Sequence, residues 1–201
     1  MRRREFFTLV GSAADTWVVP ARAQQPDQVR RIGVLNGLAE TDAETHTYDA
    51  AFRKRLDELG WVDGRNIHID YRWGAGSVER MRLFAKELVQ LNPEVIFTFT
   101  TPASAALHAE TSTIPIVFSA SDPIGSGFVA SLANPGGNMT GTTNFEASLG
   151  SKWLELLHDV APRVSRVAFM YNPDTAPFAR YYLRSIGRGG CGLPVETAAI
   201  A

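Results

Sequence analysis

The chain has 201 residues, of which 45% are hydrophobic and 20% charged, enough for one ordinary core and the beginning of a second. Its 20 basic and 21 acidic residues leave a formal net charge of −1, which argues against a nucleic acid or an anionic membrane surface as the partner. Cys191 stands alone, so an internal disulfide and a cysteine-based metal cluster are excluded.

Residues 1–23 have the pattern of an export signal. A basic start that contains Arg3–Phe7 (RREFF) precedes a modestly apolar run, and Ala21–Ala23 (ARA) is a small-x-small cleavage signature. The paired arginines match the core of a twin-arginine leader, which is an address read by a receptor. We therefore expect cleavage after Ala23 and a mature protein in the periplasm.

The next part of the chain alternates strand and helix signals. We expect a strand at Arg30–Asn36, a helix at Tyr48–Leu59, a strand at Asn66–Arg72 and a helix at Val78–Leu91. Gly60 should end the first helix and Ser77 should cap the second. Gly74–Ser77 begins like a dinucleotide fingerprint, but Glu79 occupies the third glycine position, so a flexible turn is the better interpretation.

Residues 95–128 repeat one strand–loop–helix unit. The strands are Val95–Phe99 and Ile114–Phe118, and hydroxyl residues and a proline follow each of them. Thr100 or Thr101 can cap a helix that begins at Pro102, and Ser121 or Asp122 can cap one that begins at Pro123. Two helix N-termini rimmed by small hydroxyls suit a small anionic or zwitterionic ligand.

The last part of the chain begins a new α/β unit. Asn138–Phe145 predicts a short edge strand or a crossover segment, and a helix at Trp153–Val160 follows. Arg166–Tyr171 predicts another buried strand. The final predicted helix runs from Phe178 to Ile186. It ends there because the glycine-rich segment Gly187–Gly192 follows.

This alternation predicts an α/β fold with a doubly wound parallel sheet that has helices on both faces. Ligands of such sheets bind outside the carboxyl ends of the strands. The loops expected there are rich in hydroxyl and amide groups and poor in titratable ones, which favours recognition over proton transfer.

No constellation typical of an enzyme emerges, so we expect no catalytic residues, no metal and no cofactor. The histidines have no metal-ligand spacing; they are His46, His68, His108 and His158. Gly125–Gly127 lacks the Gly-x-Ser-x-Gly frame of a nucleophile elbow. Asp122 is the most plausible functional carboxylate, and a role as helix N-cap explains it equally well.

Several segments together resemble one family. They are the leader Arg3–Phe7, Arg31–Leu35 (RIGVL), Phe52–Asn66 (FRKRLDELGWVDGRN), Ile114–Phe118 (IPIVF) and Ser121–Gly125 (SDPIG). The chain is similar from Met1 to about Ile186 to the periplasmic substrate-binding proteins of ABC transporters, in particular to the tryptophan- and tyrosine-binding receptors.

The resemblance implies a periplasmic-binding-protein-like (Venus flytrap) fold. The signal peptide would be 1–23, the first lobe 30–140, the hinge crossover and helix 141–162, and the start of the second lobe 163–201. Family members continue through the second lobe and return to the first. This sequence ends earlier and carries an atypical glycine-rich segment, so we expect a truncated second lobe that cannot close.

The resemblance also implies the site and the partners. Ligand residues of such families lie on strand-end loops, which here means Asn36, Thr100, Thr101, Ala103, Ser121, Asp122 and, across the cleft, Asn172. The partners would be a small-molecule ligand and a membrane permease that reads the closed form. The receptor would be a monomer and would bind no nucleic acid.

The ligand class stays open at this point. The strand-end hydroxyls suit a carboxylate, whereas Trp73 or Tyr171 would suit an aromatic ring. An amino-acid-like ligand, with or without an aromatic ring, combines these features. The alternatives from other classes are an exported α/β hydrolase-like enzyme and a ligand-sensing domain of a signalling system.

Overall fold

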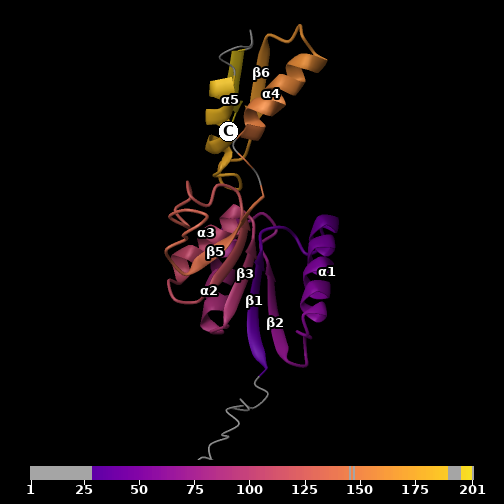
Figure 1. Cartoon of the computed structure of the whole chain (residues 1–201), viewed down its shortest axis with the longest axis vertical. Helices are drawn as coiled ribbons and strands as arrows, with labels where there is room; N and C mark the ends of the chain where they lie inside the picture. Colours follow the sequence, from indigo (N-terminus) through magenta and orange to yellow (C-terminus); the bar gives the residue numbers. More distant parts are fainter. Residues whose placement is uncertain (1–28, 145, 147, 190–195, 201) are drawn as a thin grey trace, which may run out of the picture.

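The computed structural model describes residues 29–144, 146, 148–189 and 196–200, which form two α/β units (Figure 1). The expected signal peptide, 1–23, lies outside the described residues. The strands of the first unit are β1 (Arg30–Asn36), β2 (Ile67–Trp73), β3 (Val95–Phe99), β4 (Ile116–Ala120) and β5 (Met139–Thr143). Its helices are α1 (Ala43–Glu58), α2 (Val78–Gln90) and α3 (Thr101–Glu110).

The five strands form one parallel sheet in the order β2-β1-β3-β4-β5. In this register Val34 on β1 lies between Tyr71 on β2 and Phe97 on β3. From β1 the chain first adds β2 on one side of it, and then returns to add β3, β4 and β5 on the other side. The strand order therefore reverses between β1 and β3, which is the topological switch point. The sequence allowed either an edge strand or a crossover segment at Asn138–Phe145. The structure has an edge strand there, because β5 is the last strand of the sheet.

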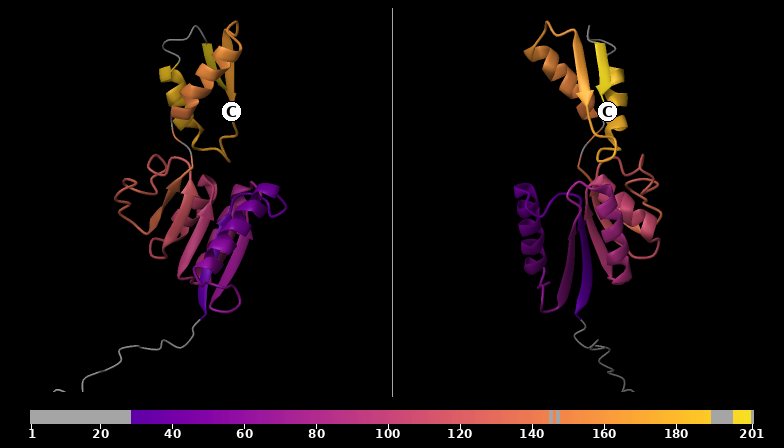
Figure 2. Two further views of the ribbon diagram at one scale, coloured as in Figure 1. Left: turned by 45° about the vertical axis from the view of Figure 1, so that its right-hand side comes forward. Right: turned by 180° about the vertical axis from the view of Figure 1, so that it is seen from behind.

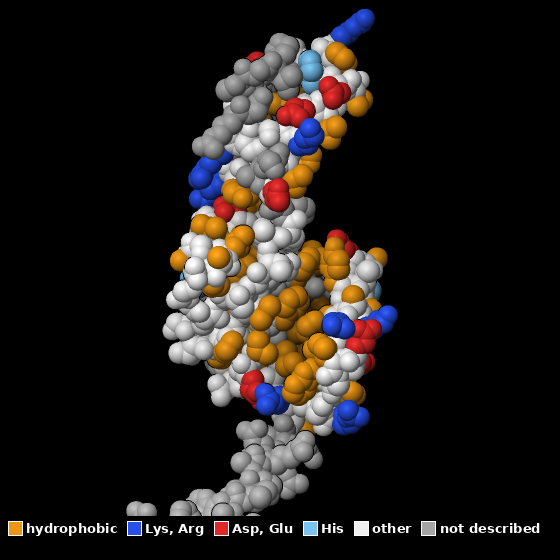
Figure 3. Space-filling view, in the orientation of Figure 1, with side chains coloured by type: hydrophobic (Ala, Val, Ile, Leu, Met, Phe, Trp, Pro, Cys, Tyr) orange, Lys and Arg blue, Asp and Glu red, His pale blue; other side chains and the backbone are white. Residues whose placement is uncertain are grey.

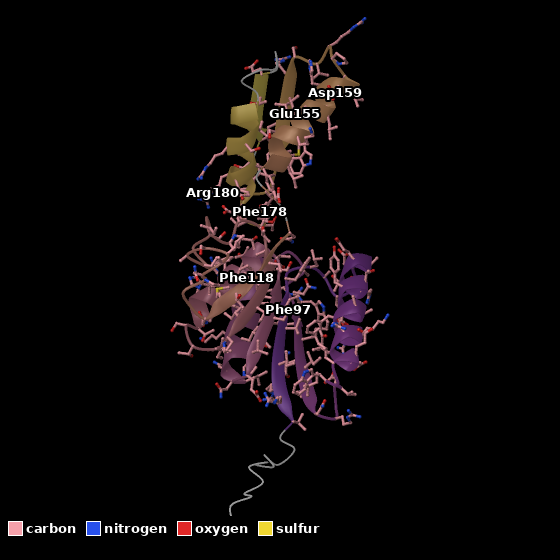
Figure 4. All side chains as sticks on the ribbon, in the orientation of Figure 1. Phe97, Phe118, Glu155, Asp159, Phe178 and Arg180 are labelled. Carbon is pink, nitrogen blue, oxygen red and sulfur yellow. The ribbon has the colours of Figure 1, made fainter. Side chains whose placement is uncertain are left out.

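Helices cover both faces of the sheet, with α1 on one side and α2 and α3 on the other (Figure 1). The larger core lies under α2 and α3 and includes Leu35, Met81, Leu88, Ile96, Leu107, Ile116 and Phe118. The smaller core under α1 contains Val34, Ile67 and Ile69. Figure 4 shows Phe97 toward α1 and Phe118 toward the opposite side, as the alternation of strand side chains requires. The expected doubly wound architecture is therefore confirmed.

The second unit contains α4 (Ser148–Val160), β6 (Arg166–Met170), α5 (Ala179–Gly189) and β7 (Glu196–Ile200). Figure 2 shows it as a separate body beyond the first sheet. The helices α4 and α5 pack closely, because a methyl group on Gly150 would lie 2.7 Å from the carbonyl oxygen of Tyr182. The strands β6 and β7 pair in parallel.

Two predictions for this unit were incomplete. The sequence interpretation ended the last helix at Ile186, whereas α5 continues to Gly189, because glycine costs a helix only about 1 kcal/mol and does not forbid it. It also missed β7, whose short run of small residues lacks clear alternation and becomes a strand by pairing with β6. Residues 190–192 of the glycine-rich segment lie outside the described residues.

The helix predicted from Pro123 was wrong, because the chain makes a single turn there. The amide of Ser126 donates to the carbonyl oxygen of Asp122 at 2.9 Å, which closes one helical turn. Gly127 then adopts a φ of +77°, which no right-handed helix can continue. The predicted capping role of Asp122 holds, since its carboxylate accepts from the amide of Gly125 at 2.8 Å.

Two further predictions for the helix ends are confirmed, whereas α1 begins at Ala43 and α4 at Ser148, earlier than predicted, and α3 begins at Thr101 without a side-chain cap from Thr100. Ser77 caps α2 by accepting from the amide of Arg80 at 3.3 Å. Gly60 follows α1 with a φ of +86°. Within the part of the chain that the structure describes, no helix is both long and apolar enough to cross a membrane.

Arg53 fastens α1 to the sheet. Its guanidinium contacts Asp49 at 3.0 Å and Asp63 at 3.1 Å, and it lies 4.5 Å from the ring centroid of Tyr71 on β2. Burial raises the pKa of Tyr71. The phenol therefore stays neutral at physiological pH and presents its ring to the cation.

We expect Arg53→Met to lower the free energy of unfolding by about 1 kcal/mol, because two carboxylates lose their partner and a cation–π contact is lost. The neighbouring Lys54→Met should change it little, since that side chain is 80% exposed and reaches Glu58 only at 4.0 Å. Urea denaturation followed by circular dichroism measures both. Equal effects of the two variants would contradict this role of Arg53.

Candidate functional site

A cavity of about 710 Å³ lies at the carboxyl ends of the parallel strands, between the two α/β units. The first unit supplies loops after β1, β3 and β4 and the start of α1, and the second unit supplies the loop between β6 and α5. Its lining residues are Leu38, Glu44, Tyr48, Phe99, Thr100, Thr101, Ser119, Ser121, Asn144, Thr175 and Phe178. This is the place where the strand order reverses, as expected for a ligand site of such a sheet.

The N-terminus of α3 forms the polar wall of the cavity. Thr100 precedes the helix with a φ of 89° and does not cap it with its side chain. The Thr100 hydroxyl is buried and has no hydrogen-bond partner among the described residues. The first amides of a helix likewise have no partner inside the helix. Polar groups of a ligand can therefore be satisfied here.

Thr101 ties two strand-end loops together. Its hydroxyl donates to the carbonyl oxygen of Ser121 at 3.1 Å and accepts from the amide of Ser121 at 3.0 Å. Both residues are buried. The loops after β3 and β4 are thus held in one arrangement, which places the hydroxyl residues side by side before any ligand arrives.

Aromatic rings form the apolar part of the cavity. The ring of Tyr48 on α1 lies 5.0 Å from that of Phe99 at the end of β3, at an interplanar angle of 49°. Figure 3 shows that hydrophobic side chains gather on this face, between α1 and the sheet. Phe178 lies at the end of the second unit that is nearest the first (Figure 4). A ligand in the cavity would therefore meet rings from both units.

Two tyrosines carry raised pKa values at the junction. The hydrogen bond to Glu44 raises the pKa of Tyr48, and its hydroxyl donates to that carboxylate. Burial raises the pKa of Tyr182 on α5. Because both pKa values are raised above their ordinary range, both hydroxyls are neutral at pH 7.

Three of the seven residues predicted for the site line the cavity, namely Thr100, Thr101 and Ser121. The other four lie elsewhere. Ala103 is fully buried inside α3, and Asn36 holds the loop after β1 by accepting from the amide of Leu38 at 2.9 Å. Asp122 caps its own turn, and Asn172 lines a neighbouring hollow and accepts from the amide of Asp174 at 2.9 Å.

The sequence did not indicate the residues that α1 and the loop before α5 bring to the cavity. Tyr48 belongs to the apolar stripe of α1 and Phe178 starts the last predicted helix, so neither was considered for the site. Glu44 belongs to no sequence motif that would indicate a binding site. The two aromatic candidates considered instead do not line the cavity, since Trp73 stacks on Tyr71 at 5.3 Å and Tyr171 lies 6.0 Å from Phe169.

A doubly wound parallel sheet followed by a second α/β unit, with a cavity between them at the strand ends, defines a periplasmic-binding-protein-like fold. The chain belongs to the ABC transporter substrate binding protein family, whose model matches residues 31–186. The match covers the first unit from Arg31 onward and reaches into α5. The family resemblance inferred from the sequence is thus confirmed.

Individual relatives agree with this assignment. A tyrosine-binding protein of Clostridioides difficile (strain R20291) is 33% identical over 122 residues, which is 60% of this chain and 35% of that relative. The crystal structure of a conserved domain protein from Vibrio cholerae has a TM-score of 0.72 at 26% identity, covering 86% of this chain and 57% of that one. A Streptococcus pneumoniae ABC domain in complex with L-Trp has a TM-score of 0.70 at 24% identity, with 86% and 58% covered.

The chain therefore spans about a third of the length of the curated relative and somewhat more than half of the length of the two solved structures.

Proposed function

We propose that this chain is an extracytoplasmic solute-binding receptor of an ABC importer that binds a small polar, amino-acid-like ligand with an aromatic portion. The observation that carries the proposal is the cavity of about 710 Å³ between the two units, which combines hydroxyl groups with aromatic rings. Pockets of this size enclose ligands no larger than a drug-sized molecule. The relative named as a tyrosine-binding protein supports the same ligand class.

The chemistry of the cavity favours recognition over catalysis. Its described lining contains hydroxyls, one amide, aromatic rings and one carboxylate, but no histidine, lysine or cysteine to serve as base or nucleophile. The family is one of transport proteins. The hydrolase and the sensor therefore remain the less favoured alternatives.

Ligand binding between two lobes suggests how the receptor signals occupancy. The ligand bridges Thr100 and Tyr48 on the first unit and Phe178 on the second, so in a receptor of the relatives' full length it stabilises the arrangement in which the units approach. A membrane permease then distinguishes the occupied from the empty receptor. We propose a monomer, with the first lobe at 30–140, the hinge crossover and helix at 141–162 and the second lobe starting at 163.

We further propose that residues 1–23 are a twin-arginine-type signal peptide that directs the protein to the periplasm. The pattern of paired arginines, apolar run and small-residue cleavage signature supports this. The test is the N-terminal sequence of protein recovered from the periplasm. We expect it to begin at Gln24, and recovery of the intact chain from the cytoplasm alone would contradict the proposal.

The function is tested by a ligand panel on the purified chain. We expect at least one member of a set of amino acids, purines and sugars to raise the melting temperature, because a ligand that binds only the folded state stabilises it. Isothermal titration then gives the affinity. Turnover of an ester or a glycoside, with no stabilisation by any panel member, would favour the hydrolase instead.

Thr101→Val should weaken binding of the stabilising ligand about tenfold, since the loops after β3 and β4 lose the hydroxyl that joins them. Thr113→Val is the matched control, because Thr113 precedes the amino end of β4, away from the cavity. Isothermal titration compares the two variants. Equal affinities of the variants would mean that the ligand binds elsewhere.

A further inference from the structure

The charge of the described cavity lining is negative. Of the described residues that line the cavity, Glu44 alone has a charged side chain, because the other polar lining groups are hydroxyls and one amide. None of the ion pairs found among the described residues includes Glu44. A ligand with only a negative charge would therefore be repelled, whereas a positively charged group would find an unpaired carboxylate.

The Glu44 carboxylate is held in place by its own helix. The Glu44 amide donates to the carboxylate of Asp42 at 2.9 Å, which fixes the first turn of α1. One turn further on, the Tyr48 hydroxyl donates to the Glu44 carboxylate. This leaves Glu44 with acceptor capacity for another donor, since a carboxylate can accept several hydrogen bonds.

The carboxylate also stands next to an aromatic surface. Tyr48 binds Glu44 through its hydroxyl and packs its ring on Phe99, so the negative charge and the two rings form one continuous surface. Both the carboxylate and the faces of the rings attract a cationic nitrogen. Phe99 is followed directly by Thr100 and Thr101, which line the same cavity.

We infer that Glu44, positioned by Tyr48, is the specificity-determining residue that binds a cationic nitrogen of the ligand. The ligand class is then an amine or amino acid with a flat apolar body that packs on Tyr48 and Phe99, and not an acid without a positive charge. This inference rests on the proposed function, because it assigns a role within the same cavity.

The test uses three probes with one ring and different charged ends: L-tyrosine, tyramine and 3-(4-hydroxyphenyl)propanoate. Isothermal titration of the full chain should show that the two probes with an ammonium group bind more tightly than the propanoate. Glu44→Gln should weaken binding of both about tenfold and leave the propanoate unchanged or slightly tighter. Tyr48→Phe keeps the ring but releases the carboxylate, so a loss in the same direction but smaller is expected.

Glu58→Gln is the matched control, because Glu58 lies at the other end of the same helix and the substitution changes the net charge equally. It should leave all three affinities unchanged. If Glu44→Gln binds L-tyrosine as tightly as the parent, or if the parent prefers the propanoate, the inference is overturned while the receptor function stands. If neither these probes nor the wider panel binds the parent, both the receptor function and the inference fail.

Discussion

Phe118→Ala is expected to lower the free energy of unfolding by about 3 to 5 kcal/mol, the usual cost of removing a fully buried phenyl ring. Phe118 is 1% exposed and lies at the centre of β4, where it contributes to the larger core with Leu107 and Ile116. Its ring also lies 6.1 Å from that of Phe128. Because these neighbours belong to different elements, the cavity left by the substitution cannot close fully. Urea denaturation followed by circular dichroism measures the loss.

Val117→Ala is the control for this prediction, because Val117 precedes Phe118 on the same strand and points to the opposite face. Its side chain is 37% exposed, so the expected loss is less than about 1 kcal/mol. A larger loss for Val117→Ala than for Phe118→Ala would mean that β4 is turned over in the sheet. The pair therefore tests the register as well as the core.

Gly141→Ala is expected to destabilise the chain by about 3 kcal/mol, although it adds only one methyl group. An added Cβ on Gly141 would lie 2.0 Å from the carbonyl oxygen of Phe118, its partner across the β4–β5 pairing. Backbone atoms inside a sheet cannot move aside as a flexible side chain can. The edge strand β5 must therefore shift or detach.

The same substitution should also reduce ligand affinity. The strand β5 leads directly to Asn144, which lines the cavity, and the chain then enters the second unit. Gly137→Ala is the matched control, since an added Cβ there has no neighbour within 4 Å and its stability should change by less than about 0.5 kcal/mol. Urea denaturation and isothermal titration of both variants test the prediction. Parent-like behaviour of Gly141→Ala would contradict the close approach of β5 to β4.

Most of the first unit could be predicted because its signals are local. The apolar runs at β1 and β3 and the helical stripe of α2 depend only on nearby residues, and so do the N-cap at Ser77 and the glycine after α1. The turn after Pro123 shows the limit of such reasoning. A cap and a first-turn proline are present at that turn, but Gly127 at positive φ ends it before a second turn can form.

The candidate site was predicted only where the strand ends themselves supply it. Thr100, Thr101 and Ser121 follow their strands directly, so their place in a parallel sheet was foreseeable. Glu44 and Tyr48 reach the cavity from a helix, and Phe178 reaches it from another unit. No spacing in the sequence connects Tyr48 with Phe99, which lies 51 positions further on and 5.0 Å away between ring centroids.

The local hydrophobic periodicity and the residues that cap or break helices and strands were sufficient to predict the parallel α/β architecture. They also predicted the edge of the sheet at which a ligand should bind. The physical reason is that strand and helix patterns, caps and breaking residues act within a few positions of the chain. The tertiary structure decided the charge and shape of the cavity, because these depend on which helix covers which strand and on the contact between the two units. It also decided that β7 exists, since a short run of small residues becomes a strand only when β6 offers it a partner.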